Sequence, residues 1–191
     1  MDQRLEFLFP ALWAAWALYW WAASFDVKRT ARRESVASRL SHIVPLALAV
    51  ALLASRAVPP IPGLALRWLP HTAWPAWLGA LLTAAGLAFT VWARRVLGRN
   101  WSAVVTLKSD HQLITTGPYR YARHPIYTGL LLAVAGSAMA RGDVRALIAL
   151  ALAGAAFWHK LRIEEAWLRE RFGSDYDAYA RRVAALIPKV L

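Results

Sequence analysis

The sequence predicts an all-α membrane protein with five transmembrane helices, of which the last two form a helical hairpin, and a small cytoplasmic region. Apolar runs of helical length alternate with short basic segments, and 59% of the 191 residues are hydrophobic, with eleven Trp among them. The absence of Cys excludes disulfides, thiolate catalysis and Cys-ligated metals. The length fits one domain over residues 1–191, with three spans in residues 1–96 and a distinct C-terminal half in residues 97–191.

The net charge of +12 does not indicate nucleic-acid binding, because Lys and Arg alternate with apolar blocks instead of lining one soluble face. With five spans and the N-terminus outside, 18 of the 23 basic residues fall in cytoplasmic segments. By the positive-inside rule we expect an integral membrane protein, of the inner membrane if the source is bacterial. Its C-terminus and the polar segments 94–124 and 159–191 should then lie in the cytoplasm.

Three uncharged runs in the first half predict three spans. Residues 7–25 carry four Trp and follow mixed charges instead of a basic segment, so we expect a retained helix and not a cleaved signal peptide. Residues 40–55 predict the second helix, which the proline-rich segment 59–63 ends. Residues 77–93 predict the third helix, closed by two arginines.

The second half predicts shorter elements. Two β-rich runs, 103–107 and 112–116, flank a polar turn and predict a small hairpin or an extended loop pair packed on the helices. Residues 125–140 and 146–158 predict the last two spans. The tight connection 141–145 predicts that they form a helical hairpin, which either crosses the membrane fully or enters and leaves it on the same side. Both spans carry small residues four apart, which allow close contact between helices in lipid.

A charged amphipathic helix should follow over residues 159–171. Ser174 and Asp177 have the spacing of a capping box, which predicts a last short helix from Ser174 through Ala184. The charges Lys160, Arg162, Glu164 and Glu165 have spacings that also fit ordinary surface ion pairs. Their position directly after an apolar span instead favours a functional role, because burying charge there is costly.

The segment from Gly117 to Gly129 concentrates the chemistry of the chain: it holds three Tyr, two Arg, one His and two Pro. Pro125 suits the first position of a helix, and the residue before a proline is driven out of the α region, so His124 should cap that helix. Such a helix start directs backbone N–H groups toward cations and aromatic rings, as an anion-binding pocket requires. The alternative is a basic anchor at the membrane interface.

The C-terminal half resembles the isoprenylcysteine carboxyl methyltransferase family of integral membrane enzymes. The matching residues, in the same order and spacing, are Leu97-Gly98-Arg99-Asn100-Trp101-Ser102, His111, Gly117-x-Tyr119, Arg123-His124-Pro125-x-Tyr127-x-Gly129, Arg162-x-Glu164-Glu165, Phe172-Gly173-x-x-Tyr176-x-x-Tyr179 and Arg182-Val183. Residues 97–191 are therefore expected to be the catalytic half.

The resemblance implies that S-adenosylmethionine binds on the cytoplasmic side and leaves as S-adenosylhomocysteine. The implied cofactor-binding residues are His111, Gln112, Leu113, Ile114, Tyr119, His124, Pro125, Ile126, Tyr127 and Glu164. The implied acceptor-binding residue is Lys160 or Arg162, and the implied catalytic residues are Arg162 and Glu164. No metal site is expected.

The implied reaction is methyl transfer to the carboxylate of a lipophilic, isoprenoid-like acceptor that reaches the site from the bilayer. A carboxylate is already ionised at neutral pH, so the reaction needs positioning, desolvation and a counter-charge but no general base. A lipidated protein or a lipophilic small molecule would serve as acceptor. The alternatives are an NADPH-dependent membrane reductase, a methyltransferase acting on an amine lipid or a small thiol, and a non-catalytic membrane adaptor.

Overall fold

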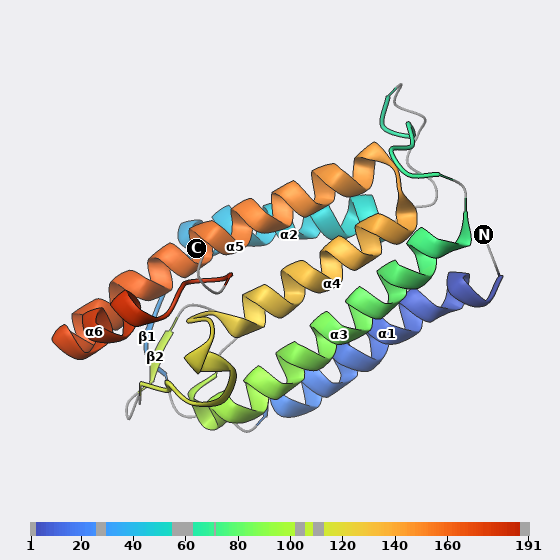
Figure 1. Cartoon of the computed structure of the whole chain (residues 1–191). Helices are drawn as coiled ribbons and strands as arrows, with labels where there is room; N and C mark the ends of the chain where they lie inside the picture. Colours follow the sequence, from blue (N-terminus) through green and yellow to red (C-terminus); the bar gives the residue numbers. More distant parts are fainter. Residues whose placement is uncertain are drawn as a thin grey trace.

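The computed structural model describes residues 3–25, 30–54, 63–70, 72–101, 106–108 and 113–187, and helices dominate it (Figure 1). The elements in chain order are α1 (Gln3–Ala23), β1 (Thr30–Arg33), α2 (Val36–Ala54), α3 (Ala73–Leu97), the 3-10 turn η1 (Gly98–Asn100), β2 (Thr106–Lys108), the 3-10 turn η2 (Gly117–Arg120), α4 (Pro125–Arg141), α5 (Val144–Phe172) and α6 (Ser174–Arg182).

Among the described residues, three helices are long and apolar enough to cross a membrane: α2, α3 with its η1 extension to Asn100, and α5. The apolar part of α1, Phe7–Ala23, is shorter, and α4 has 17 residues. The helical membrane architecture is therefore confirmed in outline. Five complete crossings stay a prediction.

The predicted helices are present, but several of them are longer than expected. α2 begins four residues before residue 40, and α3 extends four residues beyond the predicted run at each end. The apolar run 146–158 and the charged segment 159–171 form one continuous helix, α5. The capping box predicted for α6 is wrong, because Gly173 occupies the N-cap position and no side chain caps the helix.

The predicted local hairpin is also wrong in the part that the structure describes. β2 pairs antiparallel with β1, which follows the first helix, and residues 113–116 form no strand. Residues 103–105 and Gln112 lie outside the described residues. The small sheet therefore joins the connection after α1 to the connection after α3.

Glycines bring α3 and α4 into backbone contact along one seam. A Cβ atom on Gly86 would lie 2.5 Å from the carbonyl oxygen of Gly129, and one on Gly79 would lie 2.4 Å from that of Gly136. No side chain fits at such distances, so the two backbones touch directly, as small-residue motifs allow in lipid. The small residues predicted on residues 125–140 thus serve this seam, whereas those predicted on residues 146–158 do not.

The helices follow one another across the bundle in the order α1, α3, α4, α5, α2 (Figure 1). α1 joins through indole hydrogen bonds: Trp16 Nε1 donates to Thr90 Oγ1 at 2.8 Å, and Trp13 Nε1 donates to Ser137 Oγ at 3.1 Å. On the other side, α5 presents Ala149 and Ala153, both almost fully buried, to a core cluster that includes Ala49 of α2.

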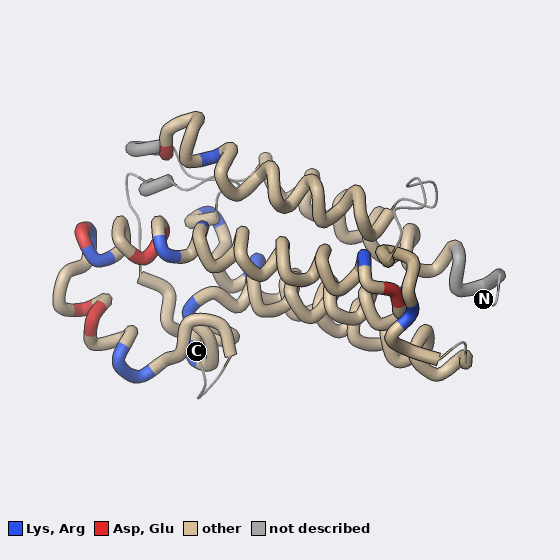
Figure 2. Tube along the Cα trace, turned by 90° about the horizontal axis from the view of Figure 1, so that it is seen from above, with Lys and Arg blue, Asp and Glu red and all other residues tan. Residues whose placement is uncertain are grey.

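Charged residues gather at the two ends of the bundle (Figure 2). At one end, Asp143 caps α5 by accepting a hydrogen bond from the Ala146 N–H, and Arg141 and Arg145 flank its carboxylate at 3.1 and 2.8 Å. This cluster closes the tight α4–α5 hairpin, which the sequence predicts. The other end carries β1, β2, η2 and α6, and the polar segments around residues 120 and 165 meet there (Figures 1 and 2).

Candidate active site

The Arg123-His124-Pro125 sequence opens α4 as predicted, with His124 at the N-cap. The residues after α6 hold this segment in place. The backbone N–H groups of Arg123 and His124 donate to the carbonyls of Ala184 and Ala185, both at 2.9 Å. These two N–H groups are therefore used within the protein and are not free to bind an anion.

Glu165 of α5 is the centre of a buried ion network. Its Oε1 atom lies 2.7 Å from Arg123 Nη2, 2.8 Å from Arg123 Nε and 3.3 Å from His124 Nε2. Its Oε2 atom lies 3.2 Å from Arg169 Nη2, and the residue is only 4% exposed. Glu165 thus pairs with Arg123 and His124, which are distant in the sequence, and with Arg169 one turn along α5.

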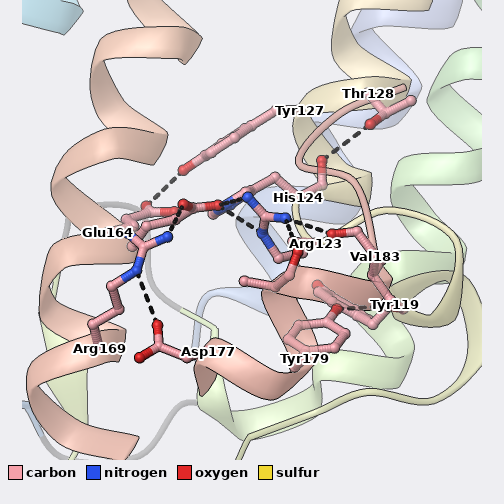
Figure 3. A network of polar contacts seen from close by, with 12 residues as sticks. Tyr119, Arg123, His124, Tyr127, Thr128, Glu164, Arg169, Asp177, Tyr179 and Val183 are labelled. Carbon is pink, nitrogen blue, oxygen red and sulfur yellow. Dashed lines mark hydrogen bonds and ion pairs between the residues drawn. The ribbon is translucent and has the colours of Figure 1, made fainter. Parts of the chain in front are cut away.

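Arg123 extends the network to the C-terminal segment. Its Nη1 atom donates to the carbonyls of Ala180, at 3.1 Å, and Val183. One guanidinium therefore fastens the start of α4 to α5 and to the end of α6 (Figure 3). Such a charge-assisted fork is a geometry that Arg provides and Lys does not.

Glu164 forms a second cluster beside the first. Tyr127 donates its hydroxyl proton to Glu164 Oε1 at 2.6 Å, and His124 Nδ1 lies 3.5 Å from Glu164 Oε2. The Tyr127 ring is stacked between His124 and Phe157, with centroid separations of 5.5 and 5.0 Å. The side chain of Glu164 is 24% exposed, so one acid of the adjacent pair is buried and the other reaches the surface of the site.

Both ring nitrogens of His124 face carboxylates, which favours the imidazolium form. Burial alone would lower the pKa of His124, but the hydrogen bonds and charges of Glu164 and Glu165 outweigh burial and raise this pKa above its ordinary value of 6.5. A protonated His124 has no lone pair with which to accept a proton. His124 is therefore suited to holding the two acids in place and is unsuited to acting as a general base.

This raised pKa predicts a pH dependence of stability. Because the folded-state pKa is the higher one, the stabilisation by His124 is complete below pH 6.5 and is lost as the pH rises through the folded-state value. We expect the Tm of the purified protein in detergent to fall above about pH 6.5. The fall should be steeper for the wild type than for His124→Gln, which cannot titrate. The same dependence of Tm on pH in the two proteins would contradict a raised pKa of His124.

The two candidate residues for binding the acceptor, Lys160 and Arg162, lie on different faces of α5. Lys160 is 9% exposed, and its Nζ atom lies 5.5 Å from the centroid of the Tyr127 ring. Arg162, two positions further along α5, is exposed. Successive helix positions differ by about 100°, so residues two apart lie on nearly opposite faces. Lys160 therefore belongs to the cluster with Tyr127, and the predicted catalytic residue Arg162 does not.

A small pocket of about 60 Å³ lies beside the ion network. Its lining is largely apolar and aromatic and consists of Leu97, Leu113, Ile114, Tyr119, Arg123, Leu168, Tyr176 and Tyr179. Burial raises the pKa of Tyr179 to about 12, so its hydroxyl stays protonated and donates to the Tyr119 carbonyl. The hydroxyl of Tyr176 is buried without a hydrogen-bond partner among the described residues.

The predicted site residues thus fall into groups. Leu113, Ile114 and Tyr119 line the pocket, whereas His124, Tyr127, Glu164 and Lys160 form the adjoining cluster. Pro125 is buried at the start of α4, and Ile126 packs against the apolar core cluster. His111 and Gln112 lie outside the described residues.

Several residues of the site are missing from the predicted site set, among them Glu165, Arg123, Tyr176 and Tyr179. The aromatic pair is three residues apart in a helix, which places both rings on one face. That spacing could have assigned them to the site. For Arg123 no local pattern identifies Glu165 as its partner.

Residues 74–175 match the model of the phospholipid methyltransferase family. Among known proteins, the chain is 30% identical over 122 residues to the nickel-cobalt-cadmium resistance protein NccN of Alcaligenes xylosoxydans xylosoxydans. This alignment covers 63% of this chain and 56% of that protein. The chain is 34% identical over 96 residues to the protein-S-isoprenylcysteine O-methyltransferase of Schizosaccharomyces pombe, covering 49% and 41%. The Saccharomyces cerevisiae protein of the same name is 32% identical over 114 residues, covering 58% and 48%. The chain spans about half the length of these relatives.

Proposed function

The chain belongs to the phospholipid methyltransferase family, and we propose that it is an S-adenosylmethionine-dependent membrane methyltransferase that acts on the carboxylate of a lipophilic, isoprenoid-like acceptor. The observation that carries the proposal is the meeting of Tyr127, Glu164 and Lys160 at one end of the bundle. An aromatic ring, a partly exposed acid and a buried cation are the groups that a sulfonium cofactor and an acidic acceptor would require.

The cofactor side of this proposed site is the pocket with Tyr119, Tyr176 and Tyr179 together with Glu164. Glu164 would pair with the amino group of the cofactor, and the aromatic rings would pack against its adenine. The faces of the Tyr127 ring are stacked against His124 and Phe157, so Tyr127 would act through its hydroxyl, which donates to Glu164 and holds that acid in place. The buried Tyr176 hydroxyl, which has no partner among the described residues, fits a polar ligand in the pocket.

The acceptor side is the buried Lys160. When bound, the cofactor supplies a methyl group on a cationic sulfur. Lys160 would hold the acceptor carboxylate near the Tyr127 ring, and the surrounding apolar helices would exclude water. Transfer to a carboxylate neutralises one positive and one negative charge, so a dry site favours it. The protein has to position and desolvate the reactants but does not have to remove a proton.

The membrane orientation remains part of the proposal: the N-terminus outside, with the C-terminus and the site in the cytoplasm. It is supported by the 18 of 23 basic residues on that side and by the meeting of the motif segments at one end of the bundle (Figure 2).

Binding of S-adenosylhomocysteine tests the cofactor assignment. We expect isothermal titration of the purified protein to give a Kd in the micromolar range, about −8 kcal/mol. His124→Ala and Tyr127→Ala should each weaken binding at least about tenfold, because each disturbs the position of Glu164. Tyr121→Ala is the matched control, since Tyr121 belongs to the same motif but is 50% exposed.

If both variants fold and bind S-adenosylhomocysteine with normal affinity, the motif is an interfacial anchor and not part of a cofactor site. Binding of NADPH in place of S-adenosylhomocysteine would favour the reductase alternative.

A further inference from the structure

A buried acid–imidazole pair lies at the start of α2, outside the family match. His42 is 1% exposed and Glu34 is 7% exposed. His42 Nε2 lies 3.5 Å from Glu34 Oε1, and Ser38 donates a hydrogen bond to the other carboxylate oxygen at 2.8 Å. The carboxylate is thus oriented by α2 itself, and it keeps a proton on the Nε2 side of the ring.

The second nitrogen of this ring is unused. His42 Nδ1 is buried and has no hydrogen-bond partner among the residues that the structure describes. A buried polar atom without a partner destabilises the folded protein, so such atoms commonly mark a bound ligand or a function.

The environment of His42 connects it to the proposed acceptor site. α2 packs against α5, and His42 and Lys160 lie on the buried faces of these two helices. Lys160 is also the cation near the Tyr127 ring. His42 therefore approaches the site from the α2 side, whereas the pocket with Tyr119, Tyr176 and Tyr179 is lined by other segments.

We propose that His42, oriented by Glu34, binds the acceptor's carboxylate together with Lys160. In this arrangement the arriving carboxylate and Glu34 together would stabilise the imidazolium form of His42, which would donate its Nδ1 proton to one oxygen of the acceptor's carboxylate. The inference rests on the proposed function and deepens it: α2, which lies outside the matched residues 74–175, would carry a determinant of acceptor specificity.

The experiment measures the binding of the acceptor and the binding of the cofactor separately. N-acetyl-S-farnesylcysteine serves as the acid probe, and its carboxamide serves as a probe of the same shape without the acid. We expect His42→Leu to raise the KM for the acid at least about tenfold, while the Kd for S-adenosylhomocysteine stays within about twofold. Binding of the carboxamide, measured by inhibition, should stay the same as in the wild type.

Two further variants keep the test informative if His42→Leu does not fold. His42→Asn retains an amide N–H near the position of Nδ1 and should recover a large part of the lost affinity for the acid. Glu34→Gln removes the balancing charge and should raise the KM for the acid by a smaller factor. Ser41→Ala is the control, because Ser41 is exposed on the same helix and should leave all values unchanged.

An unchanged KM in His42→Asn and Glu34→Gln, or equal losses for acid and carboxamide, would overturn the inference. A wild type that binds S-adenosylhomocysteine but not the acid would overturn it as well and leave the cofactor assignment intact. A wild type that binds neither would overturn the proposed function itself.

Discussion

Replacing Lys160 with methionine should lower methyl transfer by about 100-fold or more while leaving the affinity for S-adenosylhomocysteine nearly intact. Lys160 is buried beside Tyr127 and Glu164, so a carboxylate that binds there leaves water and depends on this one ammonium group. Methionine retains the length and the apolar stem of lysine and removes the charge. The measurement is a rate with labelled S-adenosylmethionine and the farnesylcysteine acid, paired with a cofactor titration.

Arg162 provides the matched control on the same helix. Arg162→Met removes one positive charge two residues away, but from an exposed side chain. We expect this variant to keep most of its activity. Full activity in Lys160→Met, or an equal loss in Arg162→Met, would mean that the cluster does not bind the acceptor.

Replacing Glu165 with alanine should destabilise the protein by about 3–5 kcal/mol, the cost of breaking a buried ion network by removing one partner. Glu165 is 4% exposed and holds Arg123, His124 and Arg169. Without it, two of these cations are buried beside each other without their main counter-charge. The effect should be visible as a large drop in Tm in detergent, followed by tryptophan fluorescence.

Asp175→Ala is a suitable control, because Asp175 is an exposed acid on the nearby α6. We expect a change in Tm of a degree or two at most from this variant, as surface ion pairs contribute about 0–1 kcal/mol. Similar changes for Glu165→Ala and Asp175→Ala would show that the network contributes little to folding.

The sequence predicts the helices well because uncharged runs and the Pro125 start are local signals. It fails for the β1–β2 pair, since the pairing joins segments more than 70 residues apart and neither strand specifies its partner. The same limit applies to Glu165: its spacing to Arg162 is visible in the sequence, whereas its actual partner Arg123 is brought to it by the fold.

The burial of Lys160 and the exposure of Arg162 could have been predicted from the sequence. Ala149, Ala153, Phe157 and Lys160 recur at helical spacing and are all buried, so they form one stripe on α5. Extending the apolar stripe into the charged segment singles out Lys160. On α2, His42 and Ala49 are seven apart and share a buried face in the same way. Nothing local indicates that these two stripes face each other.

The glycine seam between α3 and α4 gives the bundle a stiff half and a compliant half. Backbone contact at Gly79, Gly86, Gly129 and Gly136 leaves little room for side chains to rearrange, so the two helices should move as one unit. α2 meets α5 through side chains, and many of its own face outward. A bilayer that becomes thinner or more tightly packed should therefore tilt α2 first, and with it His42, while the α3–α4 pair keeps its shape.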